Sequence, residues 1–172
     1  MIVLIGFMGA GKSTVGREVA SRLGLPFVDS DSVIEERERR AVAEIFAHDG
    51  ESAFRKLERR VVHDLLTGPP AVLALGGGAV EDPVTRAEVA RADTVHLVVS
   101  AEQVRARLGS GSGRPLLVAA DPGPLLERRL PNYDAAAGIR VSTDGRSVAA
   151  VVDDVIARLT ESEGGNEATG RS

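Results

Sequence analysis

Residues 6–13 constrain the fold of this chain more than any other stretch. They read Gly-Phe-Met-Gly-Ala-Gly-Lys-Ser, follow the apolar run 1–5 and precede the amphipathic segment 14–23. A glycine-rich turn between a buried strand and a helix lets backbone N–H groups surround phosphate oxygens, and the helix N-terminus adds partial positive charge. In such a P-loop, Lys12 reaches the β- and γ-phosphates and Ser13 binds Mg²⁺. The alternative is a glycine-rich turn that carries Lys-Ser by chance.

Composition and charge narrow the classes of protein to which this chain can belong. It has 172 residues, which suits one domain, no cysteine, and a net charge of −4. The lack of cysteine excludes disulfides and thiolate metal sites. The negative charge, with one tyrosine, four phenylalanines and no tryptophan, argues against a nucleic-acid-binding surface. No apolar run reaches the length of about 18 residues that a bilayer requires and no secretory signal pattern is present, so we expect a cytoplasmic protein without a membrane partner.

Short apolar runs alternate with helical patterns along the chain. After the first run, strands are predicted at 26–28, 71–75, 94–99 and 139–142, and helices at 14–23, 54–65, 101–108 and 148–159. This alternation predicts an α/β fold with a parallel sheet, helices on both faces, and ligands beyond the carboxyl ends of the strands. Asp29, Asp31 and the run Gly76-Gly77-Gly78 follow two of these strands, so we expect them to meet at one edge.

Two further segments have the composition of mobile chain. Residues 109–113 read Gly-Ser-Gly-Ser-Gly and lead into Arg114-Pro115-Leu116-Leu117, so we interpret 109–121 as a hinged lid; a slack surface loop is the alternative. Residues 161–172 are polar and glycine-rich, and we expect a disordered tail. The remaining residues 1–160 then form one domain, in which a region at about 31–60 is inserted between the second and third strands.

Several motifs, taken together and in this order, resemble those of shikimate kinases. They are the P-loop 6–14, Phe27-Val28-Asp29-Ser30-Asp31, Ile45-Phe46 with Gly50-Glu51 and Phe54-Arg55, Leu75-Gly76-Gly77-Gly78-Ala79, Arg114-Pro115-Leu116-Leu117, and Arg129-Leu130-Pro131-Asn132-Tyr133. The P-loop alone indicates only a superfamily, whereas the full set is specific. The resemblance implies a three-layer P-loop fold with a five-stranded parallel sheet, a substrate-binding insertion and a mobile lid. It also implies transfer of the γ-phosphoryl group of Mg-ATP to the 3-hydroxyl group of shikimate. We expect the protein to be a monomer.

Asp29 and Asp31 are the candidate carboxylates of the reaction. They lie two residues apart at a strand end, so extended backbone points both to the same side. The resemblance implies that Asp29 supports Mg²⁺ with Ser13, and that Asp31 hydrogen-bonds the attacking hydroxyl and acts with Lys12 and Arg114 in catalysis. Phosphoryl transfer needs mainly alignment and charge neutralisation, so Asp31 is described better as a positioner than as a general base. Capping of the helix that follows is the alternative role for either carboxylate.

The candidate acceptor-binding residues come from three distant segments. From the sequence alone, Arg55 reads as a surface arginine in an ion-pair ladder with Glu58. The resemblance implies instead that Arg55 and Arg129 clamp the shikimate carboxylate, and that Glu58 holds Arg55 and touches the substrate. Three glycines without side chains permit close backbone approach, and the resemblance implies that Gly76, Gly77 and Gly78 lie between the γ-phosphate and the substrate. A plain tight turn is the alternative.

The resemblance also implies a set of ATP-binding residues: Gly9, Ala10, Gly11, Lys12, Ser13, Thr14, Arg107, Arg114 and Arg146. Arg107 resembles an arginine that stacks on adenine, and Arg114 one that swings onto the transferring phosphoryl group from the lid. Residues 143–147 resemble the loop on the other side of the base, but Val148 stands where related sequences often have proline. Arg39 and Ala41 replace a common glycine and serine, which predicts a local change in helix capping.

Other functions compete with this interpretation. Another small-metabolite kinase, such as a gluconate kinase, would share the P-loop but not Arg55, the three glycines and the RxPxY motif. A guanine-reading switch would carry an NKxD motif, and neither lysine of the chain, Lys12 or Lys56, lies in one. A binding protein without catalysis is the third alternative, although every expected catalytic position is filled. The three histidines, His48, His63 and His96, lack the spacing of a metal site, so we expect structural roles for them.

Overall fold

The computed structural model describes residues 1–109 and 121–167. Five strands form one parallel sheet in the order β2-β3-β1-β4-β5. They are β1 (Ile2–Ile5), β2 (Phe27–Asp29), β3 (Val72–Ala74), β4 (Asp93–Val98) and β5 (Ile139–Ser142). The predicted parallel sheet is therefore confirmed, and the strand that precedes the P-loop lies at its centre.

The strand order places the P-loop where ligands bind in folds of this kind. From the central β1 the chain builds one side of the sheet with β2 and β3, and then the other side with β4 and β5. The loop after β1 thus lies at the point where the direction of sheet building reverses. In the register, Ala74 pairs with both Leu4 and Asp29, so the ends of these three strands lie level at one edge.

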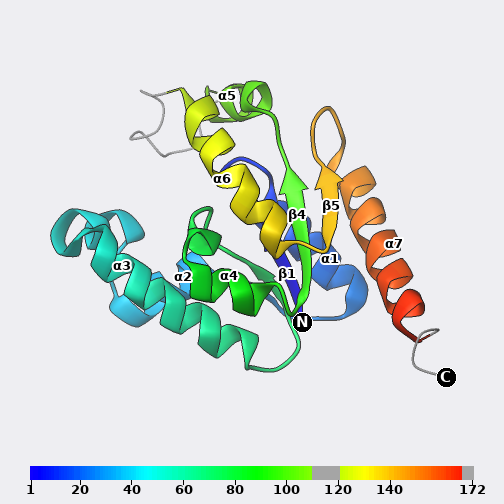
Figure 1. Cartoon of the computed structure of the whole chain (residues 1–172), viewed down its shortest axis with the longest axis horizontal. Coiled ribbons are helices and arrows are strands. Elements are labelled where there is room, and N and C mark those ends of the chain that lie inside the picture. The colour runs from blue at the N-terminus through cyan, green and yellow to red at the C-terminus, as the bar shows by residue number, and fades with distance from the viewer. Residues whose placement is uncertain (110–120, 168–172) are drawn as a thin grey trace.

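Helices cover both faces of the sheet, as predicted (Figure 1). The helices are α1 (Lys12–Leu23), α2 (Ser30–Glu38), α3 (Val42–Leu66), α4 (Pro83–Val89), α5 (Ala101–Gly109), α6 (Pro122–Ala136) and α7 (Val148–Glu167), with a 3-10 turn η1 at Ala79–Glu81. Helix α1 packs against α7, whereas α6 packs against α4 and β4. Helices α2 and α3 form the predicted insertion and pack on each other, beside the sheet in Figure 1.

Apolar side chains account for this packing. The strands bury Val3, Leu4 and Leu73 almost completely, as expected for a parallel sheet covered on both faces. A second cluster, made of Ile34, Ile45, Phe54 and Val61, joins α2 to α3. Helix α3 is interrupted at Gly50, whose φ of 82° and ψ of 166° are not helical, and its second half carries Phe54 inward. The insertion therefore has an apolar core of its own that orients the neighbouring Arg55.

Helices α6 and α7 illustrate how the structure differs from the sequence prediction. Helix α6 occupies a segment where no helix was expected, although Asp121 caps its N-terminus and Pro122 suits its first turn. Pro131 lies inside this helix, where its missing N–H normally argues against one. Helix α7 continues to Glu167, past the predicted end at Leu159, because extending a formed helix costs less than starting one. Residues 161–167, the first part of the predicted tail, are thus the last residues of α7.

Two of the predicted segments, the tail and the lid, lie partly outside the described residues. The last residues of the predicted tail, 168–172, and nearly all of the predicted lid, including Arg114, lie outside the described residues. Within residues 1–109 and 121–167, no helix is long and apolar enough to cross a membrane.

His96 is a titratable group in the middle of this core. It lies on β4 with 2% of its surface exposed, and its Nδ1 lies 3.4 Å from Oδ1 of Asp134. Its ring packs against Tyr133, with 4.9 Å between the ring centroids. Burial lowers the pKa of His96 from 6.5 to about 4, although the negative charge of Asp134 opposes this shift. The imidazole is therefore neutral in the folded protein at pH 7.

This depressed pKa predicts that stability falls with acidification. In the unfolded chain His96 takes up its proton near pH 6.5, whereas the folded protein resists protonation until about pH 4. The unfolded state therefore binds more protons in this window, and stability decreases by up to about 3 kcal/mol as pH falls from 6.5 to 4. The free energy of unfolding, measured with urea between pH 7 and pH 4, should depend less steeply on pH for His96→Leu than for wild type. The exposed His48→Leu should keep the wild-type slope, and equal slopes for all three proteins would contradict the assignment.

Candidate active site

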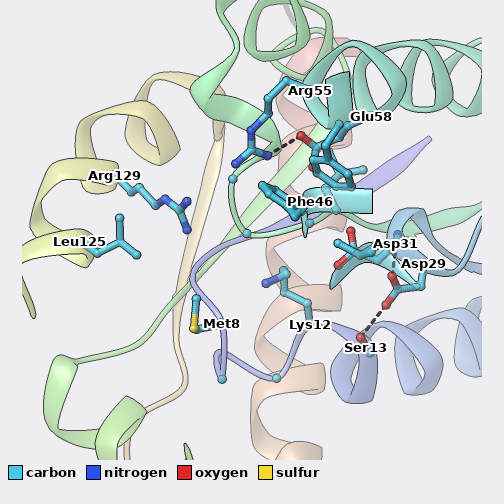
Figure 2. A pocket seen from close by; sticks show the side chains of 18 of the residues that line it. Met8, Lys12, Ser13, Asp29, Asp31, Phe46, Arg55, Glu58, Leu125 and Arg129 are labelled. Carbon is cyan, nitrogen blue, oxygen red and sulfur yellow. Dashed lines mark hydrogen bonds and ion pairs between the residues drawn. The ribbon is translucent and has the colours of Figure 1, made fainter. Parts of the chain in front are cut away.

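A cavity of about 730 Å³ opens at the edge of the sheet where β1, β2 and β3 end. Its walls come from the P-loop, the start of α2, the insertion, the three-glycine loop, α5 and α6. The lining residues are Met8, Gly9, Gly11, Lys12, Ser13, Thr14, Asp29, Asp31, Val42, Phe46, Glu51, Phe54, Arg55, Glu58, Leu75, Gly76, Gly77, Gly78, Arg107, Leu125 and Arg129. Most of the predicted site residues therefore meet in one place (Figure 2).

The P-loop forms the floor of one end of this cavity. Gly9 and Gly11 have φ values of 75° and 88°, a left-handed conformation that favours glycine, and Gly11 precedes α1 without any side-chain cap. The first N–H groups of α1 are therefore available to an anion. Nζ of Lys12 donates to the carbonyl oxygens of Gly6 at 2.8 Å and Phe7 at 3.1 Å, which keeps the ammonium group beside the loop.

Arg107 connects the P-loop to the loop that follows β5. Its Nη1 donates to the carbonyl oxygen of Gly9 at 2.7 Å, and its Nη2 donates to that of Thr143 at 2.9 Å. Arg107 thus lies beside the phosphate-binding loop and next to the loop 143–147. Arg107 and this loop are the two elements expected to lie on either side of a nucleotide base.

Ser13 and Asp29 form the candidate metal site. The Ser13 hydroxyl donates to Oδ2 of Asp29 at 2.8 Å, as Figure 2 shows, while Oδ1 of Asp29 accepts from the backbone N–H of Asp31 at 3.1 Å and caps α2. The capping role that the sequence left open is therefore real for Asp29. Hydroxyl and carboxylate oxygens are the ligands that Mg²⁺ prefers. The described residues hold no group of three or more acidic or histidine side chains placed for a metal, so nucleotide phosphates and water would have to supply the other ligands.

At the other end of the cavity Arg55 and Arg129 approach from opposite sides, and their guanidinium groups point toward one another in Figure 2. Nη1 of Arg55 donates to Oε2 of Glu58 at 2.6 Å. Glu58 has only 2% of its surface exposed, and burial raises the pKa of its carboxyl while the charge of Arg55 opposes the shift. Arg129 projects from α6 and is 11% exposed. Two partly buried cations facing one space can bind a carboxylate.

The loop Gly76-Gly77-Gly78 runs between these two ends, and a side chain at Gly76 or Gly78 would collide with neighbouring charged groups. A Cβ at Gly76 would lie 2.7 Å from Oδ1 of Asp31 and 2.8 Å from Oε1 of Glu58. A Cβ at Gly78 would lie 2.8 Å from Nη1 of Arg55. The loop is also held from behind, because the Tyr133 hydroxyl donates to the carbonyl oxygen of Gly77 at 2.5 Å. The glycines therefore bring the backbone against three charged side chains.

Three predicted site residues are not among the described residues that line the cavity: Ala10, Arg114 and Arg146. Ala10 is buried in the main apolar core. Arg114 lies outside the described residues. Arg146 does not line the cavity; its guanidinium donates to the carbonyl oxygens of Ser142 and Ala150 and pairs with Asp154 at 2.8 Å. Those contacts fix Arg146 at the start of α7, so the structure does not bring it to the site.

The structure adds residues that the sequence did not reveal. Glu81 pairs with Arg129, Phe46 lines the cavity beside Phe54, and Leu125 reaches it from α6. Phe46 belonged to a recognised motif but was given no role, because an aromatic residue at helical spacing normally indicates core. Glu81 gave no signal, because its partner lies 48 positions away in the sequence.

Comparison with known proteins assigns this arrangement to a family. The family model described as shikimate kinase matches residues 8–160. A shikimate kinase from Mycobacterium avium (strain 104) is 45% identical over 171 residues, with 97% of each chain covered. One from Rhodococcus jostii (strain RHA1) is 40% identical over 163 residues, covering 92% of this chain and 97% of that one.

Solved structures agree with the sequence comparisons. The structure described as shikimate kinase from Acinetobacter baumannii in complex with shikimate has a TM-score of 0.86 at 32% identity, covering 94% of this chain and 93% of that one. The enzyme from Aquifex aeolicus gives 0.82 at 33% identity, with 94% and 97% covered. A gluconokinase from Sinorhizobium meliloti, at 0.60 and 18% identity, covers 99% of this chain and 97% of that one but shares the fold alone. With the P-loop, the three glycines and the paired arginines in one cavity, the chain belongs to the shikimate kinase family.

Proposed function

We propose that this protein transfers the γ-phosphoryl group of ATP to the 3-hydroxyl group of shikimate, giving ADP and shikimate 3-phosphate for aromatic amino-acid (chorismate) biosynthesis. The observation that carries the proposal is the layout of the cavity, which has a phosphate-binding loop at one end, two arginines at the other and Asp31 between them. A small acid that also bears a hydroxyl group would reach from the two arginines to Asp31 and the P-loop. Family membership, and the relative whose structure contains shikimate, support shikimate as that acid.

The acceptor would be fixed at both ends. Arg55 and Arg129 bind its carboxylate through charge-assisted hydrogen bonds, and Glu58 holds Arg55 in place. Asp31 accepts a hydrogen bond from the attacking hydroxyl and directs it toward the P-loop. Because the transition state of phosphoryl transfer is loose, this alignment contributes more than early removal of the proton. The backbone N–H groups of Gly77 and Gly78 donate to the acceptor or to the γ-phosphate.

The nucleotide would lie along the P-loop. Lys12 exchanges the carbonyl oxygens of Gly6 and Phe7 for the β- and γ-phosphates, and the N–H groups from Gly9 to Thr14 surround them. Ser13 and Asp29 would hold Mg²⁺, which neutralises phosphate charge when bound. Arg107 stacks on the adenine, and Arg114 swings onto the transferring group from a lid at 109–121 that excludes water. An adenine contact of Arg146 would require its guanidinium to leave Asp154.

The remaining expectations concern the setting of the reaction. We infer a monomer that acts in the cytoplasm, without nucleic acid or membrane as a partner. The net charge of −4 supports the absence of a nucleic-acid-binding surface. Gel filtration at assay concentration checks the oligomeric state.

Acceptor choice tests the proposed function directly. ADP release from Mg-ATP should be fast with shikimate and slow with quinate, gluconate or a nucleoside monophosphate at equal concentration. Chelation of Mg²⁺ should abolish the turnover, because the bound metal ion neutralises the charge that develops on the phosphates. Turnover that requires one of the other acceptors would keep the P-loop chemistry but contradict the roles of Arg55 and Arg129.

Removal of Arg129 should weaken acceptor binding selectively. Arg129→Ala loses a charge-assisted contact of about 1.5–3 kcal/mol, so the KM for shikimate should rise roughly tenfold to a hundredfold while the KM for ATP barely changes. Arg60→Ala is a matched control, because Arg60 lies exposed on α3, where its Nε donates to the carbonyl oxygen of Lys56, and it does not line the cavity. Equal rises in the KM for shikimate and the KM for ATP would contradict the proposal that Arg129 binds the carboxylate of shikimate.

A methyl group on the three-glycine loop should displace Arg55. In Gly78→Ala the new Cβ meets the Arg55 guanidinium, and a displacement of about 1 Å at a positioning residue lowers kcat/KM roughly a hundredfold. Gly138→Ala is the control, since a Cβ there meets nothing within 4 Å. Thermal unfolding should confirm that both variants fold. An unchanged kcat/KM for shikimate in Gly78→Ala would contradict the prediction that a Cβ at this position displaces Arg55.

A further inference from the structure

Glu81 is the charged residue of this region that neither the motifs nor the proposed reaction uses. It ends the 3-10 turn η1 directly after the three-glycine loop, and 24% of its side chain is exposed. Its Oε2 lies 2.8 Å from Nη2 of Arg129 and 3.7 Å from Nη2 of Arg55. One carboxylate oxygen therefore lies close to both guanidinium groups of the proposed clamp.

Glu81 approaches the two arginines from outside the cavity. Arg55 and Arg129 line the cavity, whereas Glu81 does not. Nη1 of Arg129 lies on another side of the guanidinium, 3.9 Å from the position of a Cβ at Gly77, which is a cavity residue. Because a guanidinium carries donors along several edges, Arg129 can keep Glu81 on one edge and accept a second carboxylate on another.

The two arginines depend on Glu81 to different extents. Arg55 has a closer carboxylate in Glu58, at 2.6 Å, and another in Glu51, at 3.4 Å. For Arg129, Glu81 is the carboxylate within ion-pairing distance among the described residues, and Nε of Arg129 is buried without a hydrogen-bond partner there. A largely buried guanidinium needs a counter-charge to hold it in one orientation. Glu81 supplies that counter-charge.

We propose that Glu81 is a positioning residue for the acceptor: it bridges Arg129 and Arg55 and fixes Arg129 in the orientation that receives the substrate carboxylate. The inference rests on the proposed function and deepens it. A long arginine side chain that is ordered before binding loses less conformational entropy when the ligand arrives, so the bridge strengthens acceptor binding. The N–H of Glu81 donates to the carbonyl oxygen of Gly78 at 3.0 Å, so the same turn holds both the bridge and the glycine loop.

The opposite consequence is also physically reasonable, and the experiment separates the two. A resident carboxylate repels an incoming one, so a Glu81 that competed with the substrate would weaken acceptor binding. Removing a competitor lowers the KM for shikimate, whereas removing a positioning residue raises it.

Kinetics of Glu81→Ala and Glu81→Gln test the proposal, with shikimate binding measured separately by calorimetry. Glu81→Ala should raise the KM and the dissociation constant for shikimate about tenfold, and leave kcat and the KM for ATP within about twofold of wild type. Glu81→Gln keeps an acceptor for Arg129 and should show a smaller rise. Glu18→Ala is the matched control, because Glu18 is an exposed glutamate on α1 that pairs with Arg22 at 3.1 Å and does not line the cavity. This substitution should change none of these constants.

The remaining outcomes count against the proposal. An unchanged or lower KM for shikimate in Glu81→Ala would overturn it, as would equal rises for Ala and Gln. A proportional loss of kcat and ATP binding with a lowered melting temperature would show a merely structural role and overturn it too. Wild-type turnover tests the proposed function on its own: its absence would remove both proposals, whereas normal wild-type turnover with a failed Glu81 series would remove only this one.

Discussion

The close approach of the chain at Gly76, Gly77 and Gly78 is the constraint on which the rest of the site depends. The backbone passes so near to Asp31, Glu58 and Arg55 that a Cβ at Gly76 or Gly78 would collide with these side chains. The loop can occupy this place because β3 ends level with β1 and β2 in the sheet. Tyr133 then fixes the loop by a hydrogen bond to Gly77. A loop with side chains would push the charged groups apart and separate the two ends of the cavity.

Charge balance is the second condition that the site has to meet. Arg55 and Arg129 are both largely buried, and each is paired with a buried or half-buried glutamate. The pairs reduce the cost of keeping cations away from water, yet leave guanidinium edges directed into the cavity. Burial raises the pKa of Glu58, and Glu81 lies outside the cavity wall. We propose that both glutamates act on the acceptor through the arginines. The P-loop end meets the same condition differently, with Lys12 held on backbone carbonyl oxygens.

The features predicted well from the sequence are those encoded over short stretches. The P-loop, the strands and the glycine run each lie within one segment, and strand ends of a parallel sheet meet by topology alone. Helix α6 was not expected, because Pro131 argues against a helix locally and only packing against α4 and β4 offsets it. Glu81 and the turned-away guanidinium of Arg146 depend on partners that only the folded chain brings near. The resemblance to a family supplied the role of Arg129, which composition and spacing could not.

We propose that the cavity holds a carboxylate between two arginines and aims a hydroxyl group at the P-loop. A crystal structure of the protein with shikimate and Mg-ADP measures this directly. The account predicts the shikimate carboxylate within hydrogen-bond distance of both Arg55 and Arg129, and the 3-hydroxyl beside Asp31 facing the phosphates. A carboxylate bound at the P-loop, or an acceptor that leaves Arg129 untouched, would contradict it.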